Sequence, residues 1–351
     1  MRSHYFLRVA ATLLLALAAA LLCVWLRTPL PWIIGPLLAT AAASVLRART
    51  ESWTPLRNAG QCTIGIALGL YFTPQVTALV ASLWWAIALG IAWALGLGGL
   101  FGLWLQRMNA HRLPGGLNRA TTWFAGAIGG ASEMTLLAER AHARTDLVAA
   151  AHSMRLLIVT VSIPFGMQLS GLHGLGLLPA GVREVHAGGL LLLFALAAAG
   201  AWIMERLDRA NPWFLGALLV SMGFTMADVQ LSALPAGLSN TAQLVIGVSL
   251  GVRFTPAFVH TAPRWLATVA LGTLGLLALC AGLALGMAWL TGLHPATLVL
   301  ATAPGGIAEM SITAKVLQLG APVVTAFQVC RLIAVLLLVE PLFRWRHGGR
   351  R

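Results

Sequence analysis

The sequence predicts an all-α integral membrane protein that is built as two inverted repeats. Of its 351 residues, 59% are hydrophobic and 9% are charged, whereas a soluble domain is about 25% charged. Its mean hydropathy is +0.85, and apolar runs long enough to cross a hydrocarbon core of about 30 Å follow one another along the chain. Three groups of residues from the first half also recur in the second. We therefore expect about ten transmembrane helices and two broken or re-entrant helices.

Twelve apolar segments supply these predicted helices. The first begins after Arg2 and is long for the hydrophobic region of a secretion signal, so we interpret it as a retained helix. The segments are residues 6–26, 31–46, 58–73, 77–105, 119–141, 147–168, 187–204, 212–227, 240–254, 264–291, 296–317 and 322–343.

An internal duplication is indicated by three blocks that recur in the same order. The pairs are PWIIG at 31–35 with PWFLG at 212–216, eight identities at an offset of 182 that begin with Gln61 and Gln243, and GGASEM at 129–134 with GGIAEM at 305–310. An arginine follows the glutamate of the third block by 22 residues in both copies. We place repeat 1 at residues 1–176 and repeat 2 at 177–351.

The distribution of basic residues predicts that the second repeat is upside down. If all six segments of each half cross, 13 of the 23 Lys and Arg residues are cytoplasmic and 8 are outside. If the Gly-Gly segment returns to its own side, 18 are cytoplasmic and 3 are outside, which agrees better with the positive-inside rule. Five crossings per half invert the second copy, as in many secondary transporters. Both termini, and the loop around Arg140 and Arg144, are then expected in the cytoplasm.

Glu133 and Glu309 are carboxylates within otherwise apolar sequence, each beside two glycines. The four glycines are Gly129, Gly130, Gly305 and Gly306. A helix interrupted at bilayer depth is tolerated only where its open backbone groups are buried in protein or face a wet cavity. The resuming helix presents the positive end of its dipole there. The glutamates are therefore candidates to bind H⁺ or Na⁺, while capping the half-helix is the alternative structural role.

Arg155 and Arg331 lie about nine residues into the following apolar segments, too deep to reach the interface easily. Because a guanidinium stays charged, each needs an anionic partner. The two alternatives are a glutamate of either repeat and an anionic group of a substrate. His152 precedes Arg155 by three residues and so shares its helix face, where the second repeat has Gln328. It is a candidate proton relay or a hydrogen-bonded structural residue.

Gln61 and Gln243 precede runs with Gly-x-x-x-Gly spacing. This spacing indicates close helix packing. The glutamines are candidates to donate to the substrate or to the broken helix, and the sequence does not choose between these roles.

Several classes of function are disfavoured by composition. The net charge of +13 suggests nucleic acid, but the basic residues lie in short loops and at the C-terminus, as in membrane proteins. No extramembrane segment is long enough for a DNA-binding module, and we expect no direct nucleic-acid partner. The four cysteines are isolated, and the nine histidines form no spaced ligand group. We expect no metal site, no cofactor and no enzyme activity.

The three duplicated blocks, especially Gly-Gly-x-x-Glu-Met and Pro-Trp-x-x-Gly, resemble the AbrB-type membrane protein family, a bacterial group with an internal duplication. The resemblance covers nearly the whole chain and implies an inner-membrane location. Members carry two labels, regulator of gene expression and ammonia monooxygenase. The inverted repeats are also similar, at the level of fold, to the cation–proton antiporter and bile-acid symporter superfamily, which implies no particular substrate.

We expect a secondary transporter of a small anionic solute coupled to H⁺ or Na⁺. The alternative is a membrane sensor or regulator that affects gene expression indirectly, and a monooxygenase subunit is the third hypothesis. The expected partners are the solute, the ion and the lipid bilayer, and a homo-oligomer is left open. Glu133, Glu309, Arg155 and Arg331 are expected to meet near the midplane.

Overall fold

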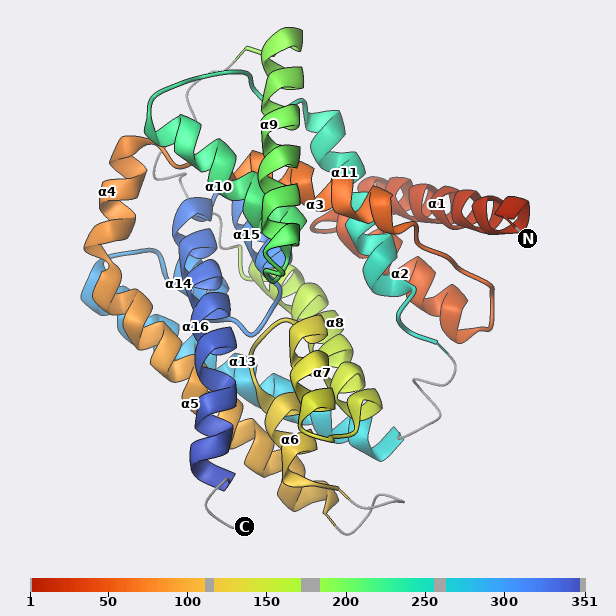
Figure 1. The fold of residues 1–351 in the computed structure, drawn as a ribbon, viewed down its shortest axis with the longest axis vertical. Coiled ribbons are helices and arrows are strands. Elements are labelled where there is room, and N and C mark those ends of the chain that lie inside the picture. The colour runs from red at the N-terminus through yellow and green to blue at the C-terminus, as the bar shows by residue number, and fades with distance from the viewer. Residues whose placement is uncertain (1, 111–116, 172–183, 256–262, 348–351) are drawn as a thin grey trace. The chain divides into compact units, whose positions relative to one another are not determined.

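The computed structural model describes residues 2–110, 117–171, 184–255 and 263–347, and every element in these ranges is a helix (Figure 1). The first half contains α1 (Arg2–Trp25), α2 (Pro31–Val45), α3 (Thr54–Gly69), α4 (Pro74–Ser82), α5 (Trp84–Asn109), α6 (Arg119–Gly126), α7 (Ala131–Arg140) and α8 (Thr145–Leu169). The second contains α9 (Ala187–Arg206), α10 (Pro212–Met226), α11 (Ala236–Gly251), α13 (Pro263–Thr291), α14 (Pro295–Thr302), α15 (Ile307–Val316) and α16 (Ala321–His347). The predicted repeat boundary after residue 176 lies outside the described residues.

The helices confirm the predicted all-α membrane protein. Among the described residues, six helices are long and apolar enough to cross a membrane, namely α1, α5, α8, α9, α13 and α16. Four further helices, α2, α3, α10 and α11, have only 15 or 16 residues, so the predicted number of ten crossings stays a prediction. At 1.5 Å per residue they measure about 22–24 Å, which is less than a full hydrocarbon core.

The two Gly-Gly segments are broken helices, as predicted. In the first half, α6 ends at Gly126 and α7 begins at Ala131. In the second half, α14 ends at Thr302 and α15 begins at Ile307. Both pairs consist of helices of 8 and 10 residues. We refer to residues 127–130 and 303–306 as break 1 and break 2.

The predicted segment 77–105 was wrong as a single helix. The structure divides it into α4 and α5, and α4 is bent by 88° from α3. Pro74 begins α4. A proline has no N–H to continue the preceding helix and disfavours helical geometry in the residue before it, which explains the sharp bend.

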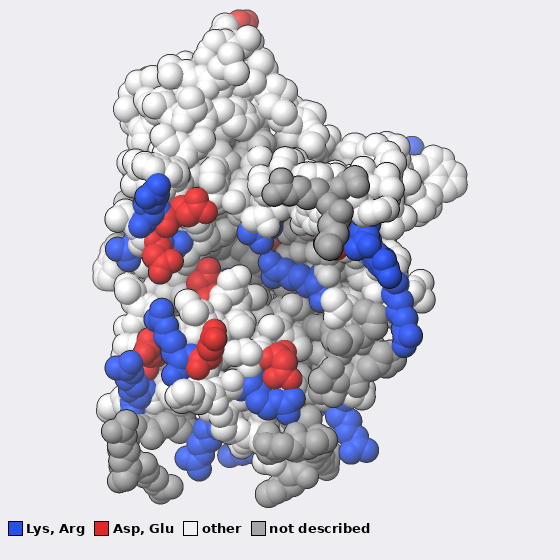
Figure 2. Space-filling view, turned by 45° about the vertical axis from the view of Figure 1, so that its right-hand side comes forward, with Lys and Arg blue, Asp and Glu red and all other residues white. Residues whose placement is uncertain are grey.

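Apolar side chains cover much of the surface, as a lipid solvent requires. Large hydrophobic residues are exposed along several of the long helices, and Trp289 of α13 is 86% exposed. Figure 2 shows few charged side chains on the visible face, with blue and red ones lying next to one another in several places.

The chain divides into two compact units, and each unit takes helices from both halves. Unit 1 contains α1 to α4, α9 to α11, the last turns of α8 and residues 311–322. Unit 2 contains α5 to α7, the rest of α8, α13, α14, the first turn of α15, and α16 from Val323. The sequence analysis predicted the repeats but not this exchange of helices.

Helix packing in unit 1 is reciprocal between the halves. The helix α3 packs on α10, and α11 packs on α2. A methyl group added at Gly65 would collide with the carbonyl oxygen of Phe214, and one added at Gly247 would lie 2.6 Å from that of Ile33. These glycines therefore permit close backbone approach, as their spacing predicted.

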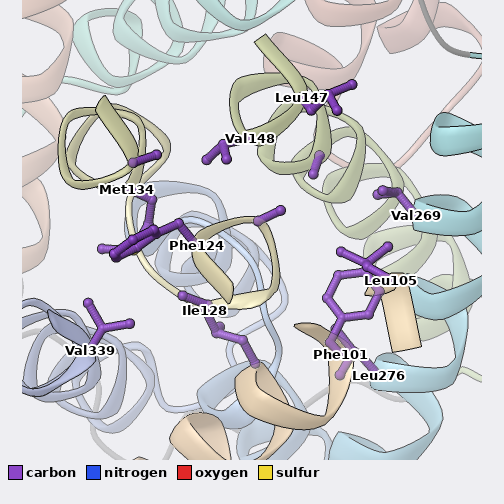
Figure 3. Packing of buried hydrophobic residues seen from close by; sticks show 14 of the residues in the cluster. Phe101, Leu105, Phe124, Ile128, Met134, Leu147, Val148, Val269, Leu276 and Val339 are labelled. Atoms are coloured by element: carbon purple, nitrogen blue, oxygen red, sulfur yellow. The ribbon is translucent and has the colours of Figure 1, made fainter. Parts of the chain in front are cut away.

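Unit 2 has its own apolar core around break 1. Buried residues of α5, α6, α7, α8, α13 and α16 form one cluster. Figure 3 shows Met134 and Phe124 beside one another in it, with Ile128 of break 1 below them. Met134 is the residue next to Glu133, so this packing anchors the first turn of α7 and positions the glutamate.

Candidate functional site

The glutamate of break 1 lies over the start of its own helix. Gly130 is the N-cap residue of α7, and Glu133 is the third residue of the helix. The Glu133 carboxylate turns back over Gly130, so that a methyl group there would collide with Oε2. This is the position from which a glutamate reaches the N-cap backbone in a capping box. Negative charge is also favoured at this end of the helix dipole.

Break 2 has the same geometry. The Glu309 carboxylate of α15 turns back over Gly306, and a methyl group at Gly306 would collide with Oε2. Glu309 is only 6% exposed, whereas Glu133 is half-buried. The capping role that the sequence analysis gave as the structural alternative is therefore consistent with both glutamates.

Each break lies against a long helix of the other half. A methyl group added at Gly129 would lie 3.2 Å from Val335 Cγ1 of α16. One added at Gly305 would lie 2.9 Å from Val159 Cγ1 of α8. Val159 and Val335 are each four residues beyond the buried arginine of their helix. The exchange between halves therefore brings both breaks close to α8 and α16 within unit 2.

Arg331 of α16 is bonded to the backbone of break 2. Its Nη1 donates to the carbonyl oxygen of Ala303 at 2.5 Å, and its Nη2 donates to that of Gly305 at 2.9 Å. The break leaves these carbonyls without helical partners, so the arginine supplies the missing donors. The side chain is 6% exposed, and its Nε has no hydrogen-bond partner.

Arg155 of α8 is held in a different way. Its Nη2 lies 2.7 Å from Nδ1 of His152, while its buried Nη1 has no hydrogen-bond partner. An arginine only donates, so His152 Nδ1 accepts. His152 Nε2 lies 2.9 Å from the carbonyl oxygen of Phe124 and therefore carries the proton. His152 is thus neutral, and a second proton would remove the acceptor that Arg155 uses.

His152 and Gln328 share one role at matched positions. Gln328 Nε2 donates to the carbonyl oxygen of Leu300 at 2.7 Å, which corresponds to the bond from His152 to Phe124. It also donates to Ala301 and Ala303. Its Oε1 is buried without a partner. Gln328 was noted only as the counterpart of His152, and its role appears when the two halves are aligned on Arg155 and Arg331.

The structure gathers most of the predicted site residues in unit 2. Neither guanidinium uses a glutamate among its partners in the described chain, because backbone carbonyls and His152 take those bonds. The unit-2 residues are Gly129, Gly130, Glu133, His152, Arg155, Gly305, Gly306, Glu309 and Arg331.

Gln61 and Gln243 belong to unit 1 and have partners there. Gln61 Nε2 donates at 3.0 Å to Oδ1 of Asn211, the left-handed residue before α10. Gln243 is 6% exposed, and its Nε2 lies 3.5 Å from Ser239 Oγ. These contacts account for the glutamines by helix packing within unit 1.

Metal-binding side chains do not gather in the part of the chain that the structure describes. No group of three His, Cys, Asp or Glu side chains there could hold a metal ion. Cys23, Cys62, Cys280 and Cys330 are free thiols.

Known proteins agree with this architecture over most of the chain. The profile of a family described as "Transition state regulatory protein AbrB" matches residues 32–347. The "Uncharacterized protein YhjN" of Bacillus subtilis is 26% identical over 343 residues, which cover 90% of this chain and 87% of the relative. The "Putative regulator AbrB" of Escherichia coli is 26% identical over 328 residues, 90% of each chain. No solved structure matches significantly. The chain belongs to this AbrB family.

Proposed function

We propose that the protein is a secondary transporter of a small anionic solute, coupled to H⁺ or Na⁺. The observation that carries this proposal is that unit 2 contains two broken helices and two buried arginines, whose hydrogen bonds within the described ranges go to His152 and to backbone carbonyls. Ionisable groups are costly inside a membrane and are retained there chiefly for function. Half-helix N-termini that point at an anion are the arrangement that many transporters use.

In this proposal the glutamates carry the coupling ion. Each carboxylate lies at the N-terminus of a half-helix, where it exchanges between capping the helix and binding H⁺ or Na⁺. The arginines supply positive charge for the solute. The protein itself is not an enzyme in this proposal. It acts in the bacterial inner membrane with both termini in the cytoplasm, which reporter fusions at Arg140 and at the C-terminus test.

Flux measurements test the transporter. The full-length protein is placed in liposomes that contain a pH-sensitive dye, and inorganic phosphate, sulfate, acetate and succinate are supplied outside with and without a Na⁺ gradient. Comparison of metabolites inside and outside cells that lack or overproduce the protein extends this panel. We expect Glu133→Gln and Glu309→Gln each to abolish coupled flux and to leave folded protein in the membrane. Full flux in the double variant would leave the glutamates only a structural role.

An indirect regulator is the second candidate, and the printed names of the family and of the E. coli relative favour it. A regulator that acts through a transported metabolite loses its effect on gene expression in the flux-negative Glu133→Gln and Glu309→Gln variants. An effect that persists in both variants would favour a sensor that does not transport. A copper assay on purified protein tests the monooxygenase label.

A further inference from the structure

The two buried arginines occupy matched positions but differ in their hydrogen bonds. Arg155 and Arg331 each follow the glutamate of their half by 22 residues and are 3% and 6% exposed. Arg331 has both terminal nitrogens on carbonyls of break 2. Arg155 donates from Nη2 to neutral His152, and its Nη1 has no hydrogen-bond partner. The inference below rests on the proposed function and assigns separate roles to the two arginines.

Arg331 is explained by structure alone. The carbonyls of Ala303 and Gly305 lie in the break, and both receive a charge-assisted hydrogen bond from it. Both terminal nitrogens are thus held by break 2, so a solute could reach only their second N–H groups and the unpartnered Nε. It therefore serves as a clamp that holds break 2 in shape.

Arg155 is not explained in this way. By the alignment of the halves, the carbonyls of Ala127 and Gly129 correspond to those that Arg331 uses, and Arg155 does not bond to them. A buried charged nitrogen without a hydrogen bond is costly. A planar guanidinium with a free donor suits the paired oxygens of a carboxylate, phosphate or sulfate group.

His152 explains why Arg155 does not bond to the carbonyls of break 1. Its Nε2 bond to Phe124 positions the ring, and its Nδ1 holds the guanidinium. In the second half, Gln328 makes the equivalent backbone bond, but its Oε1 does not hold Arg331. The histidine therefore differs from its counterpart in the one contact that keeps the arginine available.

We propose that Arg155 binds the oxyanion group of the solute, whereas Arg331 clamps break 2. His152 is the positioning residue that keeps Arg155 from bonding to the carbonyls of break 1. The ligand class is a small solute with a carboxylate, phosphate or sulfate group. Arg155 is then the one contact between the anion and this arginine pair, although the sequence repeats both arginines alike.

The first test needs no ligand. Thermal unfolding of the full-length protein is measured for Arg155→Met and Arg331→Met. We expect Arg331→Met to lower Tm by at least about 4 °C, because two buried carbonyls lose their donors. Arg155→Met removes an incompletely paired buried charge, so its Tm should be unchanged or higher. An equal fall in both variants would overturn the assignment, because Arg155 would then also be a clamp.

The second test uses inorganic phosphate, sulfate, acetate and succinate as probes. We expect at least one to raise the Tm of the wild-type protein in a saturable way, and Arg155→Met to weaken its apparent affinity at least tenfold. The charge-matched control is Arg344→Met, which alters an exposed arginine paired with Glu340. No shift with any probe in the wild type, or an unchanged shift in Arg155→Met, would reject Arg155 as the anion site.

His152→Gln separates positioning from folding. It installs the side chain found in the second half, which keeps the donor for the Phe124 carbonyl. We expect Tm without anion to stay within about 2 °C, while the anion affinity falls because Arg155 docks on break 1. Unchanged affinity would reject the positioning role. A protein that binds anions through Arg155 but shows no flux would contradict the transporter and leave this assignment standing.

Discussion

Break 1 and break 2 have the same length, and in each a glutamate lies over the second glycine, but they differ in the side chains that surround them. Break 2 is saturated with donors, since Gln328 and Arg331 both donate to the Ala303 carbonyl and Arg331 also reaches Gly305. Beside break 1, His152 donates to the Phe124 carbonyl in the last turn of α6, and Arg155 bonds to His152 rather than to the break. The duplicated sequence has therefore produced one break that is held by its arginine and one break whose arginine keeps a donor unpaired.

The difference teaches that matched residues need not have matched roles. A broken helix needs donors for its open carbonyls, and an anion site needs donors that are not already used. An N–H that already donates to a carbonyl is not available to an anion. The following four predictions test the comparison, from the largest expected effect to the smallest.

Gly126→Ala should be the most damaging change, because break 1 begins where two helices touch. A methyl group at Gly126 would lie 2.5 Å from the Gly102 nitrogen and 2.6 Å from the Gly98 oxygen, both in the backbone of α5. We expect a loss of about 3 kcal/mol or more, measured by thermal unfolding. The matched residue before break 2 is Thr302, the last residue of α14, and Thr302→Ala should cost only about 1 kcal/mol. Equal losses would contradict this asymmetry.

Gln328→Leu should destabilise break 2 by about 2 kcal/mol, since its amide donates to three buried carbonyls. Gln328→His is the control. An imidazole there keeps the donor for Leu300, as His152 does for Phe124, and should recover most of the loss. If both variants unfold at the same temperature, the hydrogen bond to Leu300 is not what stabilises this break.

Gly306→Ala should cost about 1–2 kcal/mol, because the methyl group displaces the carboxylate of Glu309 from its cap. Gly130→Ala should cost less, although it displaces Glu133 in the same way. The Gly306 methyl group would also lie 3.2 Å from Leu156 Cδ1, and break 1 has no such neighbour at Gly130. Thermal unfolding of the two variants in parallel checks which one loses more stability. A larger loss of stability in Gly130→Ala would contradict this prediction.

Gly96→Ala should have the smallest effect and the opposite sign. Nothing lies within 4 Å of the added methyl group, and alanine favours a helix over glycine by up to about 1 kcal/mol. A small rise in Tm is expected. A clear fall would show that α5 tolerates no substitution, and the loss at Gly126 would then not be specific to the break.

The sequence predicted the helices and the breaks well, because bilayer thickness and glycine act locally. The first break was expected within 119–141, and the structure places it between Gly126 and Ala131. The boundary at Pro74 was expected, but the division between α4 and α5 at Leu83 was missed, since the apolar run continues on both sides of it. The inverted orientation of the repeats stays a prediction.

The partners of the arginines were not predictable from sequence. A glutamate and a substrate were the expected alternatives, and neither is what holds Arg331, because its acceptors are backbone carbonyls. Any residue carries a carbonyl, so no residue type marks these acceptors. His152 was noted only because it lies three residues before Arg155, and its contrast with Gln328 required both halves in three dimensions.

The reciprocal packing of α3 on α10 and of α11 on α2 has a consequence for biogenesis. When the first half leaves the ribosome, the faces around Gly65 and Ile33 have no partner until the second half has been inserted. Separately expressed halves should therefore complement one another. A chain of half this length with the same faces would close both contacts by pairing with a copy of itself, which gives the gene duplication a plausible starting point in a homodimer.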